Sequence, residues 1–476
     1  MKRFSERSMW LTGFVLALFA NTSRASDTLP LKSVVDSALS AHPKAVEILA
    51  IEDQAKGEQL NAAGAFDPVL DFELKDDLQS YYLGHTVQTS VRFPTRLWGL
   101  ELQANYGLGR GEFPTYEADR LTSNGGALGV GFKLPILRNG SIDSRRFGLI
   151  RTRIGLEQAR AAGDALRLEL VREASATYFL WAAYQKKLAI SEQILEIARS
   201  RDAQFKSRTR AGDLPRMALI DNSRIILKRQ QDVIKMRQEL REYELKLSLY
   251  WRDSERQPKL PTGQLPEAVD WKTLSEADPV KLAQDRGLWG APKRPEPFTL
   301  GKEVEALQEE VALSRNRILP RLDLKVNANR GLGEGPSSLT AQETKAAVEL
   351  EVPFFFREGR GRLSASQSKL IRTEAKLRLE NDRIGTEIAA IQSRFLNRRE
   401  EWQLAQQEFE LARQLESIER RSFAEGHSNL IDVNIREETA AGAGVRVAEA
   451  EAALATSWVD YWVSLGSWRD IPLLLP

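Results

Sequence analysis

The stretch that decides the fold is Leu370–Phe409, LIRTEAKLRLENDRIGTEIAAIQSRFLNRREEWQLAQQEF. Apolar residues recur in it at every seventh position, and a second apolar row follows the first at alternating steps of four and three. The positions between the rows are mostly Arg, Glu, Gln and Lys. This spacing is typical of the a and d positions of a coiled coil. The two rows are Leu370, Leu377, Ile384 and Ile391, and Ile388, Phe395, Trp402 and Phe409.

The helix around this seam is predicted from about Arg360 to Arg421. At about 1.5 Å per residue it would be roughly 90 Å long. A globular core of ordinary size does not contain a helix of this length. A purely structural coiled coil is one interpretation, and the flanking segments offer another.

Composition restricts the class of protein. Charged residues make up 28% of the 476 residues and hydrophobic residues 42%, which excludes a disordered chain and a helical membrane protein. The formal net charge of +2 argues against nucleic acid as a partner. The absence of cysteine excludes disulfides, thiolate metal sites, a cysteine nucleophile and a lipid-carrying N-terminal cysteine. The three histidines lie far apart in sequence, so we expect no metal site and no cofactor.

The N-terminal residues have the pattern of a secretory signal peptide. Lys2 and Arg3 provide positive charge, Met9–Ala20 is apolar, and Ser23-Arg24-Ala25 offers small residues for cleavage after Ala25. No other stretch approaches 18 apolar residues. We therefore expect an exported chain, which as a membrane protein would have to use β-strands.

A helical segment, Leu31–Ala63, is interrupted at His42-Pro43 and precedes the first strands. From Asp67 onwards the apolar period changes from 3.6 to 2, which indicates strands with one apolar and one polar face. The alternating positions span five to seven residues in each run, and with the flanking residues a run is about ten residues long, which suits a tilted membrane strand. The runs are Leu70–Leu74, Val87–Phe93, Leu100–Tyr106 and Leu128–Leu134, and later Leu322–Ala328 and Ala346–Val352. A soluble sandwich with one wet face would produce the same alternation.

Long helices follow each group of strands. The first is predicted over Arg145–Arg208, and a return helix is predicted over Arg216–Trp251. The Gly- and Pro-containing segment between them predicts an antiparallel helical hairpin. The Pro-rich segment Asp253–Glu296 then joins the two halves. The second half has the order helix (Thr299–Ile318), two strands, coiled-coil helix, turn (Gly426–Asn429) and return helix (Leu430–Leu465).

Fixed offsets indicate an internal duplication. The strand-opening prolines Pro68 and Pro320 lie 252 residues apart, and the strand-closing prolines Pro135 and Pro353 lie 218 apart. The first half thus holds 34 additional residues, about one β-hairpin. We predict a signal peptide (1–25), a first repeat (26–252), a linker (253–297) and a second repeat (298–476). A soluble sandwich does not interleave strands with helices of this length, so the repeat favours membrane strands mounted on periplasmic helices.

The order of these motifs resembles the outer membrane efflux protein family, the TolC-like channels. Each motif alone is weak, but their repeated order is specific and covers essentially all of the predicted mature chain. The motifs are ILPRLDL (residues 318–324), the joints LPIL (134–137) and VPFF (352–355), and the tips AGD (211–213) and EGHSNLIDV (425–433).

The resemblance implies a mixed α and β membrane protein that forms a homotrimer. Three chains would share one β-barrel in the outer membrane, continuous with an α-helical coiled-coil tunnel through the periplasm. The implied function is an exit duct of a tripartite efflux or secretion system, surrounded by outer membrane lipid. A periplasmic adaptor and an inner-membrane transporter are the implied partners. Relatives place two strands of each repeat in the barrel, so the additional hairpin predicts either a wider barrel, with six strands per chain, or a hairpin at the rim.

The resemblance also places the functional residues at the helix tips. The residues expected to contact the adaptor are Gly212, Asp213, Gly426, His427 and Ser428. A swing of the inner helices at these tips would open the channel.

In the family, an acidic residue six positions after the second tip glycine helps to form the constriction, and Asp432 occupies that place here. The second acidic position, three residues further on, is Ile435. In the first repeat the matching places hold Ala218 and, three residues on, Asp221. A ring of three Asp432 carboxylates would favour cations. Asp432 can equally be a solvated residue of the first helical turn, where Asp is favoured.

Three functions remain open at this point: a channel for small solutes, a type I secretion channel for polypeptides, and a structural periplasmic coiled coil. The sequence does not identify the exported substrate. An enzyme is not expected, because the chain has no nucleophile paired with a base and no phosphate-binding loop. Gly107–Gly111 is rich in glycine, but no helix follows it.

Overall fold

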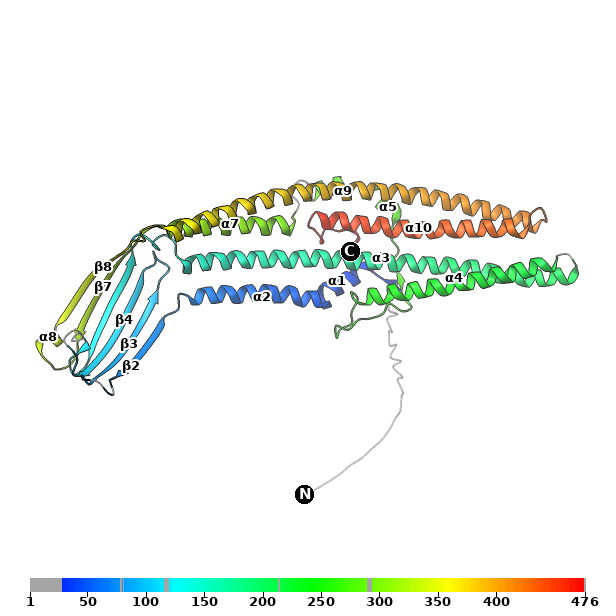
Figure 1. Cartoon of the computed structure of the whole chain (residues 1–476). Coiled ribbons are helices and arrows are strands. Elements are labelled where there is room, and N and C mark those ends of the chain that lie inside the picture. Colours follow the sequence, from blue (N-terminus) through cyan, green and yellow to red (C-terminus); the bar gives the residue numbers. More distant parts are fainter. Residues whose placement is uncertain are drawn as a thin grey trace, which may run out of the picture.

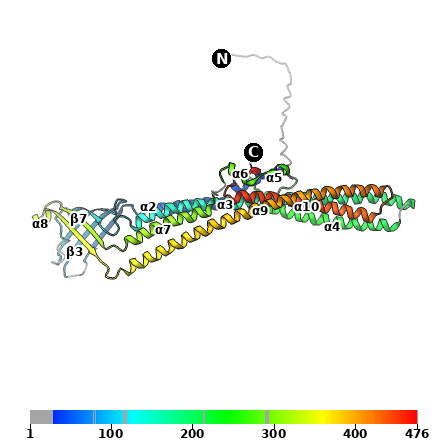
Figure 2. The ribbon, with the colours of Figure 1, turned by 90° about the horizontal axis from the view of Figure 1, so that it is seen from above.

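The structure, a computed structural model, describes residues 28–77, 79, 81–114, 120–212, 215–288 and 293–474. The predicted signal peptide therefore lies outside the described residues. The molecule is long and narrow, with a β-sheet at one end and two helical hairpins that point away from it (Figure 1). A small group of short helices lies on one side of the long helices near their middle (Figure 2).

The long helices match the predicted ones to within four residues at each end. Both main helices are 68 residues long, which corresponds to roughly 100 Å. Among the described residues, no helix is both long and apolar enough to cross a lipid bilayer. The helices are α3 (Ser144–Ala211), α4 (Arg216–Ser248), α7 (Pro295–Asn316), α9 (Arg357–Ala424) and α10 (Leu430–Ser464).

The break predicted at His42-Pro43 separates helix α1 (Leu31–Ala41) from helix α2 (Pro43–Gly64). His42 has extended backbone angles, and its Nδ1 accepts a hydrogen bond from the Lys44 backbone N–H at 3.1 Å. Pro43 occupies the first position of α2, where a missing N–H costs nothing. His42 thus caps the second helix while the chain turns.

The helices pack in the order α9, α10, α3, α4 (Figure 1). The predicted seam of α9 faces the neighbouring helices. Ile384, Ile391 and Phe395 are buried, and the other five seam residues are partly buried. Near the sheet α9 packs against α7, and near the tips it packs against α10.

The main hydrophobic core lies near the middle of the helices, where the aromatic residues of α3 and α10 meet. The ring centroid of Trp458 on α10 lies 5.1 Å from that of Phe395 on α9, with the rings tilted, and 5.9 Å from that of Trp462, in an edge-to-face arrangement. Short elements from the Pro-rich segment cover this core. These elements are α5 (Trp271–Glu276), α6 (Pro279–Asp285) and the strand β6 (Leu265–Pro266), which pairs in parallel with β1 (Thr28–Leu29).

One six-stranded sheet contains all six predicted strands. Its order is β2-β3-β4-β5-β7-β8, and every neighbouring pair is antiparallel. Four strands come from the first half of the chain and two from the second. The strands are β2 (Val69–Asp76), β3 (Gly84–Pro94), β4 (Glu101–Gly111), β5 (Ala127–Pro135), β7 (Arg321–Gly331) and β8 (Gln342–Glu351). A short helix α8 (Ser337–Thr340) lies between β7 and β8, and a 3-10 helix (Pro472–Leu474) follows α10.

The register places the apolar residues of all strands on one face. Phe72 lies opposite Thr89, which lies opposite Tyr106, and the row continues to Leu128. The neighbouring row is polar, with Glu73 opposite Gln88. The sheet therefore has one apolar and one polar face over its whole width, as the period of two predicted.

Candidate functional site

The two helix tips lie at the end of the molecule opposite to the sheet (Figure 1). Gly212 and Gly426 have φ values of 83° and 84°, in the left-handed region that glycine adopts without strain. The Gly212 N–H donates to the carbonyls of Arg208 and Thr209, and the Gly426 N–H donates to that of Phe423. A Cβ at either glycine would meet no heavy atom within 4 Å. The backbone conformation, not crowding, therefore requires glycine, and the surface beside it is open.

A hydrogen-bonded cap organises the second tip. The Asn429 side chain accepts from the Asp432 backbone N–H at 3.0 Å and donates to Asp432 Oδ2 at 2.8 Å. The Ser428 hydroxyl donates to the Glu419 carboxylate, and His427 is exposed. Asp432 is therefore an exposed carboxylate in the first turn of α10, which is the position favoured by the helix dipole.

The remaining predicted tip residues belong to the first hairpin. Asp213 lies outside the described residues. Asp221 lies on α4, and its Oδ1 is 3.7 Å from Arg224 Nε. Ile435, which replaces a second acidic residue, is exposed on α10. Asp221 and Asp432 thus belong to different hairpins, and their role in a constriction stays a prediction.

A buried ion cluster below the tips joins all four helices. Glu437 of α10 has no exposed side-chain surface, and its carboxylate contacts three arginines. Arg229 of α4 is 2.8 Å away, Arg420 of α9 is 3.2 Å away, and Arg201 of α3 donates to Glu437 and to Asn434. Burial lowers the pKa of the Arg201 guanidinium, and the nearby Glu437 charge opposes this shift.

Sequence reasoning missed this cluster, although a signal was present. Along α10 the buried residues recur at steps of three and four, and Glu437 and Glu451 occupy two places in this otherwise apolar row. A carboxylate at a seam position is costly unless it is paired. The pattern therefore indicates a buried partner, but only the packed helices identify the arginines.

The polar face of the sheet is closed over β5 by side chains from its neighbours. Gln103 of β4 donates to Asn327 of β7, across the intervening strand. Gly129 and Gly131 of β5 lie underneath, where a Cβ would overlap Asn105, Asn327 or Asn329. The glycines in the run Leu128–Leu134 thus leave room for this polar bridge.

A second polar region lies at the outer end of the same face. Residues 120–122 and 338–341 fold over it and enclose a cavity of about 960 Å³ together with the strands. Thr122 Oγ1 accepts a hydrogen bond from the Gly109 N–H at 3.0 Å. The connections at this end therefore lie over the polar face.

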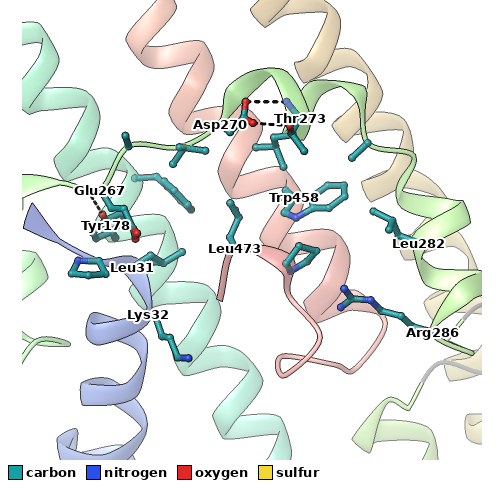
Figure 3. A pocket seen from close by; sticks show the side chains of 17 residues that line it. Leu31, Lys32, Tyr178, Glu267, Asp270, Thr273, Leu282, Arg286, Trp458 and Leu473 are labelled. Atoms are coloured by element: carbon teal, nitrogen blue, oxygen red, sulfur yellow. Dashed lines mark hydrogen bonds between the residues drawn. The ribbon is translucent and has the colours of Figure 1, made fainter. Parts of the chain in front are cut away.

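An apolar cavity of about 560 Å³ lies where the short helices α5 and α6 cover the main core (Figure 3). Leu31, Leu282, Trp458 and Leu473 project into it, and Arg286 lies at its edge. Tyr178 donates to the Leu29 carbonyl at 2.7 Å and accepts from the Glu267 N–H at 2.9 Å. These contacts attach the N-terminal strand and the linker to α3.

Part of the sequence matches a known protein family. The sequence model described as "Outer membrane efflux protein" matches residues 301–467. The matched residues run from α7 to just past α10 and so belong to the second half of the chain. Among curated protein sequences, no significant match is found.

Solved structures of outer membrane channels have the same fold. The CusC channel aligns with a TM-score of 0.66 and 14% identity, over 95% of this chain and 96% of that one. The CmeC outer membrane channel of Campylobacter jejuni gives 0.62 and 13%, over 92% and 85%. The open state of the MtrE channel of Neisseria gonorrhoeae gives 0.60 and 11%, over 98% and 97%.

The partial family match and the shared fold agree with the predicted class of protein. They support an outer membrane channel with a periplasmic extension. The structural periplasmic coiled coil is thereby set aside. The TolC-like fold confirms the predicted combination of long helices and antiparallel strands.

Proposed function

We propose that three copies of the chain stand side by side and form the exit duct of a tripartite efflux system. The sheets would line a pore through the outer membrane, and the helices would continue it through the periplasm. A periplasmic adaptor would dock at the tips and connect the duct to an inner-membrane transporter. Solutes would pass without any chemical change.

The observation that supports this assembly is that the chain has free strand edges and exposed apolar helix surface on both of its sides. Strands β2 and β8 are the free edges of the sheet, and every residue of both is exposed. An exposed edge strand invites pairing with another strand. At the helical end, α4 and α9 are the outermost helices on the same two sides (Figure 1).

Both outer helices have exposed apolar rows with heptad spacing. Exposed apolar residues recur at every seventh position on both α4 and α9. Exposed rows with this spacing are typical of coiled-coil partners that are not yet paired. The rows are Ile220, Leu227 and Ile234 on α4, and Leu404, Leu411 and Ile418 on α9.

The two sides complement one another in a head-to-tail ring. The side with β8 and α9 of one copy would meet the side with β2 and α4 of the next copy. Such a heterologous contact closes into a ring when the rotation fits. Three copies would give the homotrimer that the family resemblance implies.

The faces of the sheet support the same arrangement. Leu70, Phe72 and Leu74 on β2, and Val348 and Leu350 on β8, are exposed on the apolar face. In the ring this face would contact lipid, and the polar face would line the pore. This placement would explain why the apolar side chains are exposed in the single chain, because lipid tails would surround them in the membrane.

We further propose that the tips form the closed end of the duct. Asp432 from three copies would place three carboxylates around the axis, and this ring would favour cations over anions. Gly212 and Gly426, which have open surface beside them, would contact the adaptor. Outward movement of the tips would then open the path.

Engineered cysteines test the assembly, because the natural chain has none. Leu227→Cys combined with Leu411→Cys should form disulfide-linked dimers and trimers in outer membrane fractions after mild oxidation. Each single variant should remain a monomer on the same gel. The purified protein should form ion-conducting pores in planar bilayers. A monomer that neither cross-links nor conducts would contradict the proposed function.

A further inference from the structure

We propose that the trimer closes an eighteen-stranded barrel in the outer membrane, in which β8 of each copy pairs directly with β2 of the next. This inference rests on the proposed trimer and specifies the width of its pore. The additional hairpin of the first repeat would then be part of the barrel wall and not an appendage at its rim.

The ladder of hydrogen-bonded pairs supports this placement. The two strands that the first half has in excess lie inside the sheet, because β3 is paired with β4 over its whole length and with β2 from His85 to Arg92. Strands β3 and β4, with 11 residues each, are as long as any strand of the sheet. Their turn is fixed by Thr95, which donates to the Leu100 carbonyl through its N–H at 2.9 Å and its hydroxyl at 2.7 Å.

A side-chain bridge also ties the inner strands to the second half. The hydrogen bond from Gln103 to Asn327 connects β4 with β7 over the two glycines of β5. Removing the β3–β4 hairpin from the wall would break this bond and expose the ladder edge of β5. The hairpin is therefore as much a part of the wall as the strands of the second half.

Strand direction permits closure. The six strands alternate in direction, so β8 runs opposite to β2. Neighbouring copies can therefore continue the antiparallel ladder without a break, which an odd number of strands would not allow. β2 and β8 are 8 and 10 residues long, and their exposed apolar residues lie on the same face of the sheet. Closure removes every free edge, which is how barrels avoid aggregation.

The width of the sheet matches the width of the helices below it. Six strands about 4.8 Å apart and tilted by about 40° occupy roughly 38 Å of circumference per copy. Four neighbouring helices about 9–10 Å apart occupy roughly 36–40 Å. Four strands with the same tilt would cover only about 25 Å. With six strands per chain, the sheet and the helical wall fit each other without a step.

The expected pore in the membrane is correspondingly wide. Eighteen strands give a backbone diameter of about 36 Å, whereas twelve give about 24 Å at the same tilt. The membrane section would then be about as wide as the helical tunnel. The narrowest point of the duct would lie at the tips.

Cysteine pairs on the polar face test which strands meet between copies. Glu73→Cys on β2, combined in two separate double variants with Lys345→Cys or Ala347→Cys on β8, samples two registers of the new ladder. All three positions are exposed and lie on the polar face. At least one pair should give disulfide-linked dimers and trimers in outer membrane fractions.

The control pair is Asn105→Cys with Ala347→Cys. Asn105 lies on the polar face of β4, which becomes an edge strand only if β2 and β3 leave the wall. This pair should not cross-link between copies. Cross-linking of β4 with β8 would overturn the eighteen-stranded barrel in favour of a twelve-stranded one.

Electron cryomicroscopy of the trimer in nanodiscs gives the decisive count. Eighteen strands in the membrane section support the inference, and twelve overturn it. Cross-linking of Leu227→Cys with Leu411→Cys, without cross-linking of either β2–β8 pair, would contradict the eighteen-stranded barrel. The same result would support the trimeric duct. If none of these pairs cross-links, the trimer itself is wrong.

Discussion

Glu437 of α10 and Arg229 of α4 form a buried ion pair at 2.8 Å that connects the two helical hairpins of one chain. Arg201 of α3 and Arg420 of α9 contact the same carboxylate. One side chain therefore holds four helices at one level, seven residues after α10 begins. Without it, the buried guanidinium groups of Arg201 and Arg229 would lose their counter-charge.

Glu437→Gln should destabilise the helical part of the protein. The amide keeps the size of the side chain but leaves Arg201 and Arg229 buried without a counter-charge. Loss of one partner of a buried ion pair costs about 3–5 kcal/mol. A fall in the midpoint of thermal unfolding, followed by circular dichroism at 222 nm, would reveal it.

The neighbouring residue provides the control. Glu438 pairs with Lys228, and 58% of its side chain is exposed. Water screens this pair, so Glu438→Gln should change the midpoint little. Equal midpoints for the two variants would show that the Glu437 cluster does not stabilise the fold.

His42 predicts a dependence of stability on pH. Burial, followed by the charges of Arg252 and Lys44, lowers its pKa below the ordinary 6.5, while Glu173 acts in the opposite direction. The neutral ring also accepts the capping hydrogen bond from Lys44. As pH falls below 6.5, the unfolded chain binds a proton at His42 more readily than the folded chain. This contribution to stability is therefore present above pH 6.5 and is lost as pH falls through the lowered pKa.

The matched variant is His42→Asn, because Asn caps a helix but does not titrate. The melting temperature of the natural protein should fall more steeply between pH 7 and pH 5 than that of the variant. Parallel curves would rule out a role for His42. Both proteins should have similar stability at pH 8, since His42 is neutral there.

Asp432→Asn should reduce cation selectivity if the tips form the constriction. The Asn side chain can still accept the hydrogen bond from Asn429, so the cap of α10 should remain. Three carboxylates would nevertheless disappear from the axis. Reversal potentials across a salt gradient should move towards zero.

Glu425→Gln removes the same charge from the same tip. Glu425 caps α9 and lies seven residues before Asp432. It should leave the reversal potential unchanged. An equal shift for both variants would mean that general tip charge, not a ring at Asp432, sets selectivity.

Gly426→Trp should abolish export in living cells while the trimer still forms. The Cβ would enter open space, so no steric conflict arises within the chain. The indole would instead occupy the surface proposed for the adaptor. Accumulation of a fluorescent efflux substrate measures the loss, which should reach the level of a strain without the channel.

The left-handed backbone at residue 426 needs its own control, since any side chain there adds strain. Gly426→Asn introduces a residue that tolerates this conformation. It should retain most of the export. Loss of export in both variants would assign the effect to backbone strain and not to the adaptor surface.

Leu411→Glu should weaken the trimer. Leu411 is 61% exposed in the single chain, and the proposed contact would bury it against α4 of the next copy. Burying an unpaired carboxylate is unfavourable enough to lower the association constant by about tenfold or more. Analytical ultracentrifugation in detergent should detect smaller species. Gln403→Glu places the same charge on another part of α9 and should leave the trimer intact.

Local periodicity explains why most elements could be predicted. The seam of Leu370–Phe409 defines α9 because residues three and four apart share a helix face. The alternation in Leu128–Leu134 likewise defines β5 and both of its faces. Gly212 and Gly426 mark the tips, because a chain that reverses there needs positive φ. Each of these features depends on residues close in sequence.

The sequence by itself therefore determined the helices, the strands, their faces and the order of the elements. The tertiary structure alone decided that β3 and β4 lie inside one continuous sheet, that α10 packs between α9 and α3, and that Glu437 receives its arginines from three other helices. Arg201 lies more than 200 residues before Glu437, and no local period relates them. Such pairs form only when distant surfaces pack, because the cost of a buried charge depends on which partners the whole fold brings within reach.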